Sequence, residues 1–291
     1  AMQIALYGLA YWQELQPARL PEDTYRELQL LARQYYQMTS MLIKAKVDFN
    51  ALCDQVLPGM QELMSDHAGR HKLSDFVLRY HHTAHILKMG ETRFRKDYCK
   101  WAEKKGYRNH ERMAVLIFAT AQNGIPVLPN APSTQIVITE AIRVLHTVEA
   151  SRDAILTQMQ ALAKTLPEYS LVREMPCIGD TLAPRLIAEI GDVRRFHSKR
   201  ALIAYAGIDA PPYQSGKFCA NNRHISKRGN RYLRKTGYEV MQSYVMHKPA
   251  NDPIFTFIEK KRSEGKSGKL AMVAGLNKFL RVYYGKVTEL Y

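Results

Sequence analysis

The sequence lacks long apolar runs, clustered cysteines and a targeting segment. No stretch reaches the roughly 18 apolar residues that a membrane-spanning helix needs, and residues 1–19 show no basic stretch followed by an apolar core. Four cysteines are scattered over 291 residues, with neither the short spacing of a zinc ligand pair nor a disulfide framework: Cys53, Cys99, Cys177 and Cys219. We therefore expect a globular, cytoplasmic protein without a membrane partner.

Acidic residues are scarce relative to basic ones. The chain has 27 Asp and Glu against 42 Lys and Arg, a formal charge of +15. Residues 215–291 hold 16 basic and 5 acidic residues, whereas residues 1–214 hold 26 and 22. A basic C-terminal quarter beside a nearly neutral body is typical of a polyanion-binding surface. Charge that serves solubility alone is the alternative.

Metal-ligand patterns are also missing. His81, His82 and His85 can place two imidazoles on one helical face, but no cysteine or trio of carboxylates accompanies them. A solvated helical face is the favoured interpretation. The sequence thus predicts no metal ligands and no complete metal site in this chain.

Two long segments carry apolar residues at alternating spacings of three and four, which is the seam of a helix that packs along its length. The first seam is Leu28, Leu31, Tyr35, Met38, Leu42, Ala45, Phe49, Leu52 and Val56, and Pro58-Gly59 stops it. The second is Ala141, Leu145, Val148, Arg152, Ile155, Met159, Leu162 and Leu166, ended by Pro167. An antiparallel coiled-coil hairpin, a homo-oligomer joined by these helices, and an ordinary helical bundle all remain open.

The remaining segments are predicted to be mostly helical. Residues 1–16 contain a short helical piece, and an insert at 60–130 contains three short helices at 65–88, 91–105 and 109–122. No strand-rich block is visible. The predicted fold class is mainly α, with long coiled-coil helices followed by a C-terminal domain.

Residues 171–190 have the pattern of a helix-hairpin-helix. A short helix at 171–175 is followed by Pro-Cys-Ile-Gly and a second helix at 181–190, with Thr181 as its cap and Pro184 in its first turn. Turn amides and the second helix N-terminus of such a module can hold a DNA phosphate without reading sequence, which makes Gly179 and Thr181 candidate contacts. The usual turn has glycine where Cys177 stands. A hairpin that only packs is the alternative.

A basic loop runs into a basic helix further on. Residues 224–235 carry the cations in the order Lys227, Arg228, Arg231, Arg234 and Lys235, and Asn230 or Ser226 can cap the helix. This arrangement is suited to phosphate binding. The preceding loop, 208–220, contains Gln214-Ser215-Gly216. On chemical grounds alone Ser215 is a turn serine.

The order of these motifs resembles the C-terminal transposase domain of the IS-one-ten (IS110) family of insertion-sequence transposases, which includes the Piv-type DNA invertases. The matching stretches are residues 175–179, 188–191, 196, 205–207, 214–216 and 225–230. Tyr25-Arg26-Glu27-Leu28 and the helix after it are similar to the family's coiled-coil region. The resemblance covers most of the chain and is weak at 60–130.

The resemblance implies a DNA recombinase with a serine nucleophile, guided to donor and target DNA by a structured bridge RNA. On this sequence the serine maps to Ser215, with Ser226 as its rival. The attacking hydroxyl needs a base or metal-bound hydroxide and charge stabilisation at the phosphate. Lys217, Arg223, Lys227 and Arg228 are placed to stabilise that charge.

The resemblance also implies an N-terminal RuvC-like domain with an Asp-Glu-Asp-Asp cluster that holds Mg²⁺. We expect this chain to start after that domain and to be inactive alone, with 1–24 as a remnant, 25–168 as the coiled-coil region with its insert, and 169–291 as the transposase domain. Two alternatives stay open. One is a non-catalytic helix-hairpin-helix module that binds DNA or RNA, and the other is a structural oligomerisation protein.

Overall fold

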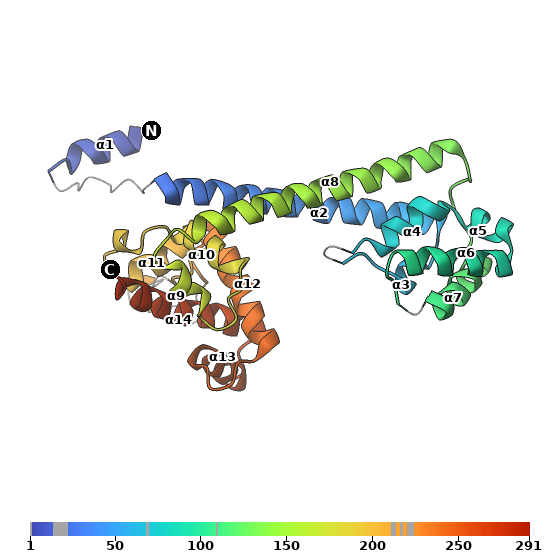
Figure 1. Cartoon of the computed structure of the whole chain (residues 1–291). Coiled ribbons are helices and arrows are strands. Elements are labelled where there is room, and N and C mark those ends of the chain that lie inside the picture. The colour runs from blue at the N-terminus through green and yellow to red at the C-terminus, as the bar shows by residue number, and fades with distance from the viewer. Residues whose placement is uncertain are drawn as a thin grey trace. The chain divides into compact units, whose positions relative to one another are not determined.

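The computed structural model is almost entirely helical (Figure 1). It describes residues 2–13, 23–67, 70–108, 110–210 and 224–291, together with the backbones of 214–215 and 218–219. Within these residues the strands are limited to one two-residue pair, so the predicted mainly α class is confirmed. None of the described helices is both long and apolar enough to cross a membrane.

The chain divides into two compact units. Unit 1 comprises Ala1–Tyr35 and Ile155–Tyr291, and unit 2 comprises Tyr36–Ala154. Two long helices, α2 (Asp23–Val56) and α8 (Pro132–Ala163), each contribute one part to each unit. Each unit has its own hydrophobic core.

The long helices follow the predicted seams. The seam positions of α2 are buried or half-buried, and α2 ends at Val56, just before Pro58-Gly59 as expected. The seam positions on α8 are buried or half-buried too. In unit 2, Leu42 and Phe49 of α2 belong to the same core as Leu145 and Val148 of α8. The apolar period therefore marks the faces that these helices bury within one chain.

The described residues of unit 2 form five further helices. They are α3 (Met60–Leu63), α4 (Lys72–Tyr80), α5 (Thr83–Met89), α6 (Glu91–Lys104) and α7 (His110–Asn123). The last two match the helices predicted at 91–105 and 109–122. Aromatic side chains supply much of the core, and Phe76 packs edge-on against both Tyr98 and Trp101.

The single helix predicted at 65–88 is wrong, because the chain breaks at the histidines. His81 has a left-handed backbone (φ 51°) that ends α4, and its N–H still bonds to Val77 O. His82 is buried and begins α5, where its Nδ1 accepts from Ala84 N at 3.0 Å. The expected solvated helical face at His81, His82 and His85 is therefore also wrong. A periodicity of apolar residues continues through such a break, so it gave no warning.

Unit 1 contains the remaining elements. They are α1 (Met2–Ala10), α9 (Tyr169–Arg173), α10 (Leu182–Ile190), the 3₁₀ turn η1 (Val193–Arg195), α11 (Lys199–Ala206), β1 (Gln214–Ser215), β2 (Phe218–Cys219), α12 (Arg231–His247), α13 (Pro253–Ser263) and α14 (Gly268–Thr288). Its core joins apolar residues of α9 to α14 with Tyr25 and Leu28 of α2. Buried Glu168 accepts hydrogen bonds from Tyr25 OH (2.8 Å) and Tyr291 OH (2.9 Å), which joins the start of α2 and the C-terminal residue to the segment before α9.

Candidate nucleic-acid interface

The segment predicted as a helix-hairpin-helix contains two helices, α9 and α10, with a turn between them. Cys177, which stands where glycine is usual, has a positive φ of 61°. A cysteine in this left-handed region costs about 1–2 kcal/mol relative to glycine. The backbone requirement of the turn is therefore kept although the glycine is absent. Gly179 is exposed, and its carbonyl accepts from the amides of Leu182 and Ala183 at the start of α10.

Thr181 does not cap α10 with its side chain, contrary to the prediction. Its backbone is already near-helical (φ −91°, ψ −36°), and no side-chain cap hydrogen bond is formed. An N-cap hydroxyl reaches the amides from an extended backbone, so this conformation removes the geometry. Instead Asp180 lies in the turn and accepts from Arg173 Nε, and this hydrogen bond holds the pKa of the Asp180 carboxyl below its usual range. The pairing offsets a negative charge that would otherwise oppose a phosphate at the turn.

Asn230 connects three motif stretches that are far apart in the sequence. Its Oδ1 caps α12 by accepting from Tyr232 N (2.9 Å) and Leu233 N (3.0 Å), as predicted. Its Nδ2 donates to Glu189 Oε2 on α10 at 2.6 Å and to Tyr205 OH on α11 at 3.1 Å. Glu189 is 2% exposed, and burial raises the pKa of its carboxyl. One side chain thus fixes the start of the basic helix against both α10 and α11.

The basic loop before Asn230 lies directly on the end of α11. Asn230 N donates to Tyr205 O at 2.7 Å, and Lys227 N donates to Gly207 O at 3.0 Å. A Cβ on Gly229 would press on Tyr205 O and stand 2.8 Å from Gly207 N. Only glycine leaves room for this backbone approach. Arg234 Nη1 donates to Ala206 O at 2.9 Å, so it satisfies a carbonyl at the end of α11.

A pair of residues closes the base of the loop that carries Ser215. Ser226 Oγ donates to Asp209 Oδ1 at 2.5 Å, and Ser226 N donates to Asp209 O at 2.8 Å. Ser226 Oγ also accepts from Arg228 N at 3.3 Å. Between these ends, β1 and β2 pair antiparallel with Ser215 opposite Phe218. The predicted nucleophile therefore lies in a hairpin whose two ends are tied together.

The candidate site residues differ in whether the structure describes them and in how exposed they are. Lys217 and Arg223 lie outside the described residues, as does the side chain of Ser215. Lys227, Arg228 and Arg231 are exposed. Arg231 Nη2 donates to Tyr232 OH at 2.8 Å, and its guanidinium lies 4.8 Å from the ring centre of Tyr232. Arg234 is half-buried and serves the fold through Ala206.

A basic groove was missed by the sequence analysis. It has a volume of about 530 Å³ and lies between α13, α14 and Ile208, next to the loop base at Asp209. Phe257 and Val273 line it, with Lys278 and Arg281 adding positive charge. The only available signal was the three-residue spacing of Lys278 and Arg281, which places both on one helical face.

The acidic residues of unit 1 do not fit a Mg²⁺ cluster. Asp209 is paired with Ser226, Asp192 Oδ1 accepts from Arg194 N, and Asp252 Oδ1 caps α13 through Ile254 N and Phe255 N. Glu239 forms an ion pair of 2.6 Å with Arg185. Among the described residues of unit 1, no three of these groups converge on one point.

Residues 169–254, which contain the hairpin, the loop base and most of α12, match the profile described as "Transposase IS116/IS110/IS902 family". This stretch is thus a transposase-type domain. The resemblance to the IS110 family, which the ordered motifs indicated, is confirmed by this match and by the relatives below.

Individual relatives also support the resemblance to the IS110 family. The chain is 22% identical over 259 residues to "Insertion element IS110 uncharacterized 43.6 kDa protein" of Streptomyces coelicolor, covering 89% of this chain and 62% of that protein. It is 27% identical over 136 residues to the "Pilin gene-inverting protein" of Moraxella bovis, covering 45% of this chain and 42% of the other. It is 33% identical over 81 residues to "Transposase for insertion sequence element IS1111A" of Coxiella burnetii, covering 26% and 21%. The chain thus spans less than two thirds of each of these relatives.

Proposed function

We propose that this chain is the DNA-handling part of an insertion-sequence recombinase and that Ser215 is its nucleophile. The Ser215 oxygen attacks a scissile DNA phosphorus and displaces a deoxyribose oxygen, which leaves as a free hydroxyl end. The serine proton passes to a base. The phosphoserine bond keeps the energy of the broken bond, so attack by a second DNA hydroxyl rejoins strands and releases the serine.

The observation that carries this proposal is the closed base of the Ser215 loop. Asp209 and Ser226 join the two ends of the loop through a side-chain and a backbone hydrogen bond. Next to this base, Gly229 lets the backbone lie against the end of α11, and Asn230, the cap of α12, donates to Tyr205 of α11. A nucleophile on a loop is effective only when rigid elements limit its position.

The structure also favours Ser215 over Ser226. The Ser226 hydroxyl donates to Asp209 and accepts from Arg228 N, so both of its bonding functions are used to shape the loop. An attack by Ser226 would break the side-chain hydrogen bond to Asp209, which is one of the two bonds that join the ends of the loop. We therefore assign Ser226 a positioning role and Ser215 the attack.

The proposed binding of DNA and RNA rests on exposed cations. Lys227 and Arg228 stand on the loop, and Arg231 stands in the first turn of α12, all exposed beside the Ser215 hairpin. Cations at this place can bind a DNA backbone and stabilise charge on the attacked phosphate. The proposed binding of a structured guide RNA rests on the family resemblance and on the same exposed cations. Self-association through the α2 and α8 helices is a further part of the proposal.

We propose that the basic loop does not supply the proton acceptor. Lys and Arg are normally protonated near neutral pH and do not take the proton, and Asp209 and Glu239 are engaged with Ser226 and Arg185. We propose that an acidic cluster of a RuvC-like domain, which would hold Mg²⁺, completes the site. The chain alone then binds DNA but does not cleave it.

The competing function is a helix-hairpin-helix module without chemistry. The turn geometry at Cys177 and the exposed Gly179 support DNA binding equally well in that case. A strand-joining assay distinguishes the two functions. In this assay the chain is supplied with a RuvC-like domain of the family. Ser215→Ala should bind DNA like the parent and join no strands, whereas Ser226→Ala should keep part of the activity because the Ser226 backbone bond to Asp209 remains. If no protein in this assay joins strands, and each binds DNA alike, the binding module is the correct function.

A further inference from the structure

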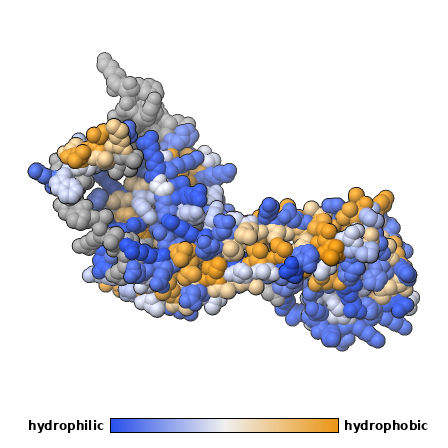
Figure 2. Space-filling view, turned by 90° about the horizontal axis from the view of Figure 1, so that it is seen from above, coloured by the Kyte–Doolittle hydropathy of each residue, from blue (hydrophilic) through white to orange (hydrophobic). Residues whose placement is uncertain are grey.

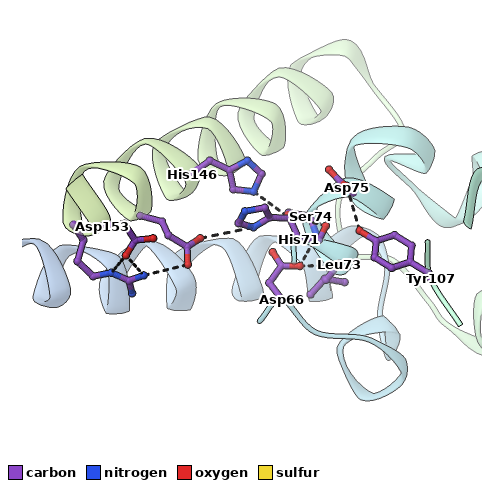
Figure 3. A network of polar contacts seen from close by, with 10 residues as sticks. Asp66, His71, Leu73, Ser74, Asp75, Tyr107, His146 and Asp153 are labelled. Atoms are coloured by element: carbon purple, nitrogen blue, oxygen red, sulfur yellow. Dashed lines mark hydrogen bonds and ion pairs between the residues drawn. The ribbon is translucent and has the colours of Figure 1, made fainter. Parts of the chain in front are cut away.

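A polar cluster in unit 2 has no part in the proposed function. Asp66, from the segment between α3 and α4, His71, at the start of α4, and His146, on α8, come together there (Figure 3). Each offers one ligand atom, and these three atoms lie within 4.8 Å of one another. The residues come from segments up to 80 positions apart in the sequence, so no short motif announces the cluster.

Asp66 is held in place by one carboxylate oxygen and leaves the other without a partner. Its Oδ1 accepts from Leu73 N (2.7 Å) and Ser74 N (3.1 Å) at the start of α4. Its Oδ2 is buried and has no hydrogen-bond partner among the described residues. A buried unpaired carboxylate oxygen costs free energy, so the position is suited to a cation.

The two imidazole rings lie close together and are tilted by 44° to each other. The ring centres of His71 and His146 are 4.2 Å apart, and His146 Nε2 lies 3.0 Å from Ser74 Oγ. His71 Nδ1 is buried without a hydrogen-bond partner among the described residues, and Glu149 Oε2 stands 3.7 Å away.

We infer that Asp66, His71 and His146 form a binding site for a divalent transition metal, with Zn²⁺ as the best fit. Two imidazole nitrogens and one carboxylate oxygen are a ligand set that zinc uses, whereas Mg²⁺ and Ca²⁺ prefer oxygen ligands. Bonds of about 2.0–2.1 Å bring ligand atoms to roughly 3.4 Å from one another, so the three side chains close by small rotamer changes. The ion takes the unpaired Oδ2 of Asp66 as a ligand.

Glu149 is the positioning residue of this site. Its carboxylate faces His71 Nδ1 and is itself held by Arg152, whose Nη2 lies 3.6 Å from Glu149 Oε1. A carboxylate that hydrogen-bonds one ring nitrogen keeps the proton there and directs the other nitrogen to the metal, and Glu149 reaches that distance by a small shift toward His71 Nδ1 when the metal binds. A hollow of about 260 Å³ beside the cluster, lined by Ser65 and Asp66, gives the ion a way in. The bound ion joins the segment before α4 to α8, which are neighbours only in the folded unit.

The test is metal binding by the full chain after treatment with a chelator. We expect one Zn²⁺ per chain with micromolar or tighter affinity, a raised melting temperature on binding, and a Co²⁺ absorption spectrum typical of a nitrogen and oxygen site. Mg²⁺ and Ca²⁺ at the same concentration should produce no shift. His71→Gln and His146→Gln should each weaken binding at least 10-fold, and Glu149→Gln about 10-fold as expected for an outer-shell carboxylate.

Two further variants keep the result interpretable. Asp66→Asn retains an oxygen that accepts from Leu73 N and Ser74 N, so it should fold while losing metal affinity at least 10-fold. His247→Gln, in exposed His247 of unit 1, should bind like the parent. Zn²⁺ affinity unchanged in both His71→Gln and Asp66→Asn, or the absence of any equimolar binding, would overturn the inference. This readout does not depend on DNA, so it stands or fails apart from the proposed recombinase activity.

Discussion

The Ser226 hydroxyl donates to Asp209 Oδ1 at 2.5 Å, and the Ser226 amide donates to Asp209 O at 2.8 Å. Together these bonds tie the two ends of the loop that holds Ser215. The tie rests on α11, because the stretch from Lys227 to Asn230 is bonded to the carbonyls of Gly207 and Tyr205. The Asp209–Ser226 pair therefore connects the loop that carries the proposed nucleophile, Ser215, to the end of α11.

The close approach at Gly229 makes the first prediction. Gly229→Ala should lower the free energy of unfolding by about 2 kcal/mol or more, since the added Cβ would meet backbone atoms of Tyr205, Gly207 and Ala204. Gly285→Ala on α14 is the matched control, because a Cβ there meets nothing within 4 Å. It should be neutral or slightly stabilising. Chemical denaturation of both variants decides this, and equal stability of the two would contradict the packing of the loop on α11.

The hairpin makes the second prediction. Gly179 is exposed, and a Cβ there meets nothing within 4 Å, so Gly179→Ala should fold with an unchanged melting temperature. The methyl group stands where a phosphate would approach the turn, so DNA affinity should fall several-fold for all sequences alike. Fluorescence anisotropy with two unrelated duplexes measures the loss, and Gly285→Ala should bind like the parent. Unchanged affinity in Gly179→Ala would assign the hairpin to packing alone.

The exposed cations make the third prediction. Replacing Lys227, Arg228 and Arg231 together with Ala should weaken DNA binding irrespective of sequence. The slope of log affinity against log salt should also become shallower, by about 0.9 for each DNA phosphate that the variant no longer neutralises. A matched control removes the same charge from exposed residues of α6 in unit 2: Arg93, Lys96 and Lys100. Equal reductions in affinity for both triple variants would mean that net charge, rather than this surface, holds the DNA.

Arg234 should behave differently from its exposed neighbours. Because its guanidinium donates to Ala206 O at the end of α11, Arg234→Ala should lower the melting temperature as well as any DNA affinity. It is therefore left out of the binding variant above.

The long helices make the fourth prediction. Leu42 is buried in the core of unit 2, so Leu42→Asp should destabilise the unit by roughly the 2–5 kcal/mol of a core substitution.

Apolar patches interrupt the otherwise hydrophilic surface in Figure 2, and the exposed apolar side chains of α2 include Ile43 and Val47. If the chain self-associates through α2, the double change Ile43→Asp and Val47→Asp should produce monomers that keep their helical content. Light scattering over a range of concentrations tests this, and a parent chain that is monomeric throughout would restrict α2 to packing within the chain.

The sequence predicted the helices better than the contacts between them. The seams through Leu42 and Leu145 were readable because apolar spacing directly reports the buried face of a helix. The break at His81 was not, because the apolar pattern runs through it while the backbone turns left-handed. The ordered motifs indicated the resemblance to the IS110 family, and Asn230, one of the two caps expected with Ser226, does cap α12.

The convergence of distant side chains was beyond the sequence. Nothing in local spacing indicates that Asn230 reaches Glu189 and Tyr205, or that Asp209 pairs with Ser226, because those contacts depend on how α10, α11 and α12 pack. The same holds for Asp66, His71 and His146, whereas the closely spaced His81, His82 and His85 drew attention without forming a site. Thr181 failed as a cap because the turn backbone was already near-helical at that residue.

The measurement that tests the central claim most directly is the location of a covalent protein–DNA adduct. The chain is supplied with a RuvC-like domain of the family, the reaction with DNA is quenched during strand exchange, and the digested adduct is sequenced by mass spectrometry. The account predicts a nucleotide attached to Ser215, and its loss in Ser215→Ala while DNA binding persists. An adduct on Ser226, or full strand joining by Ser215→Ala, would contradict the assignment of the nucleophile.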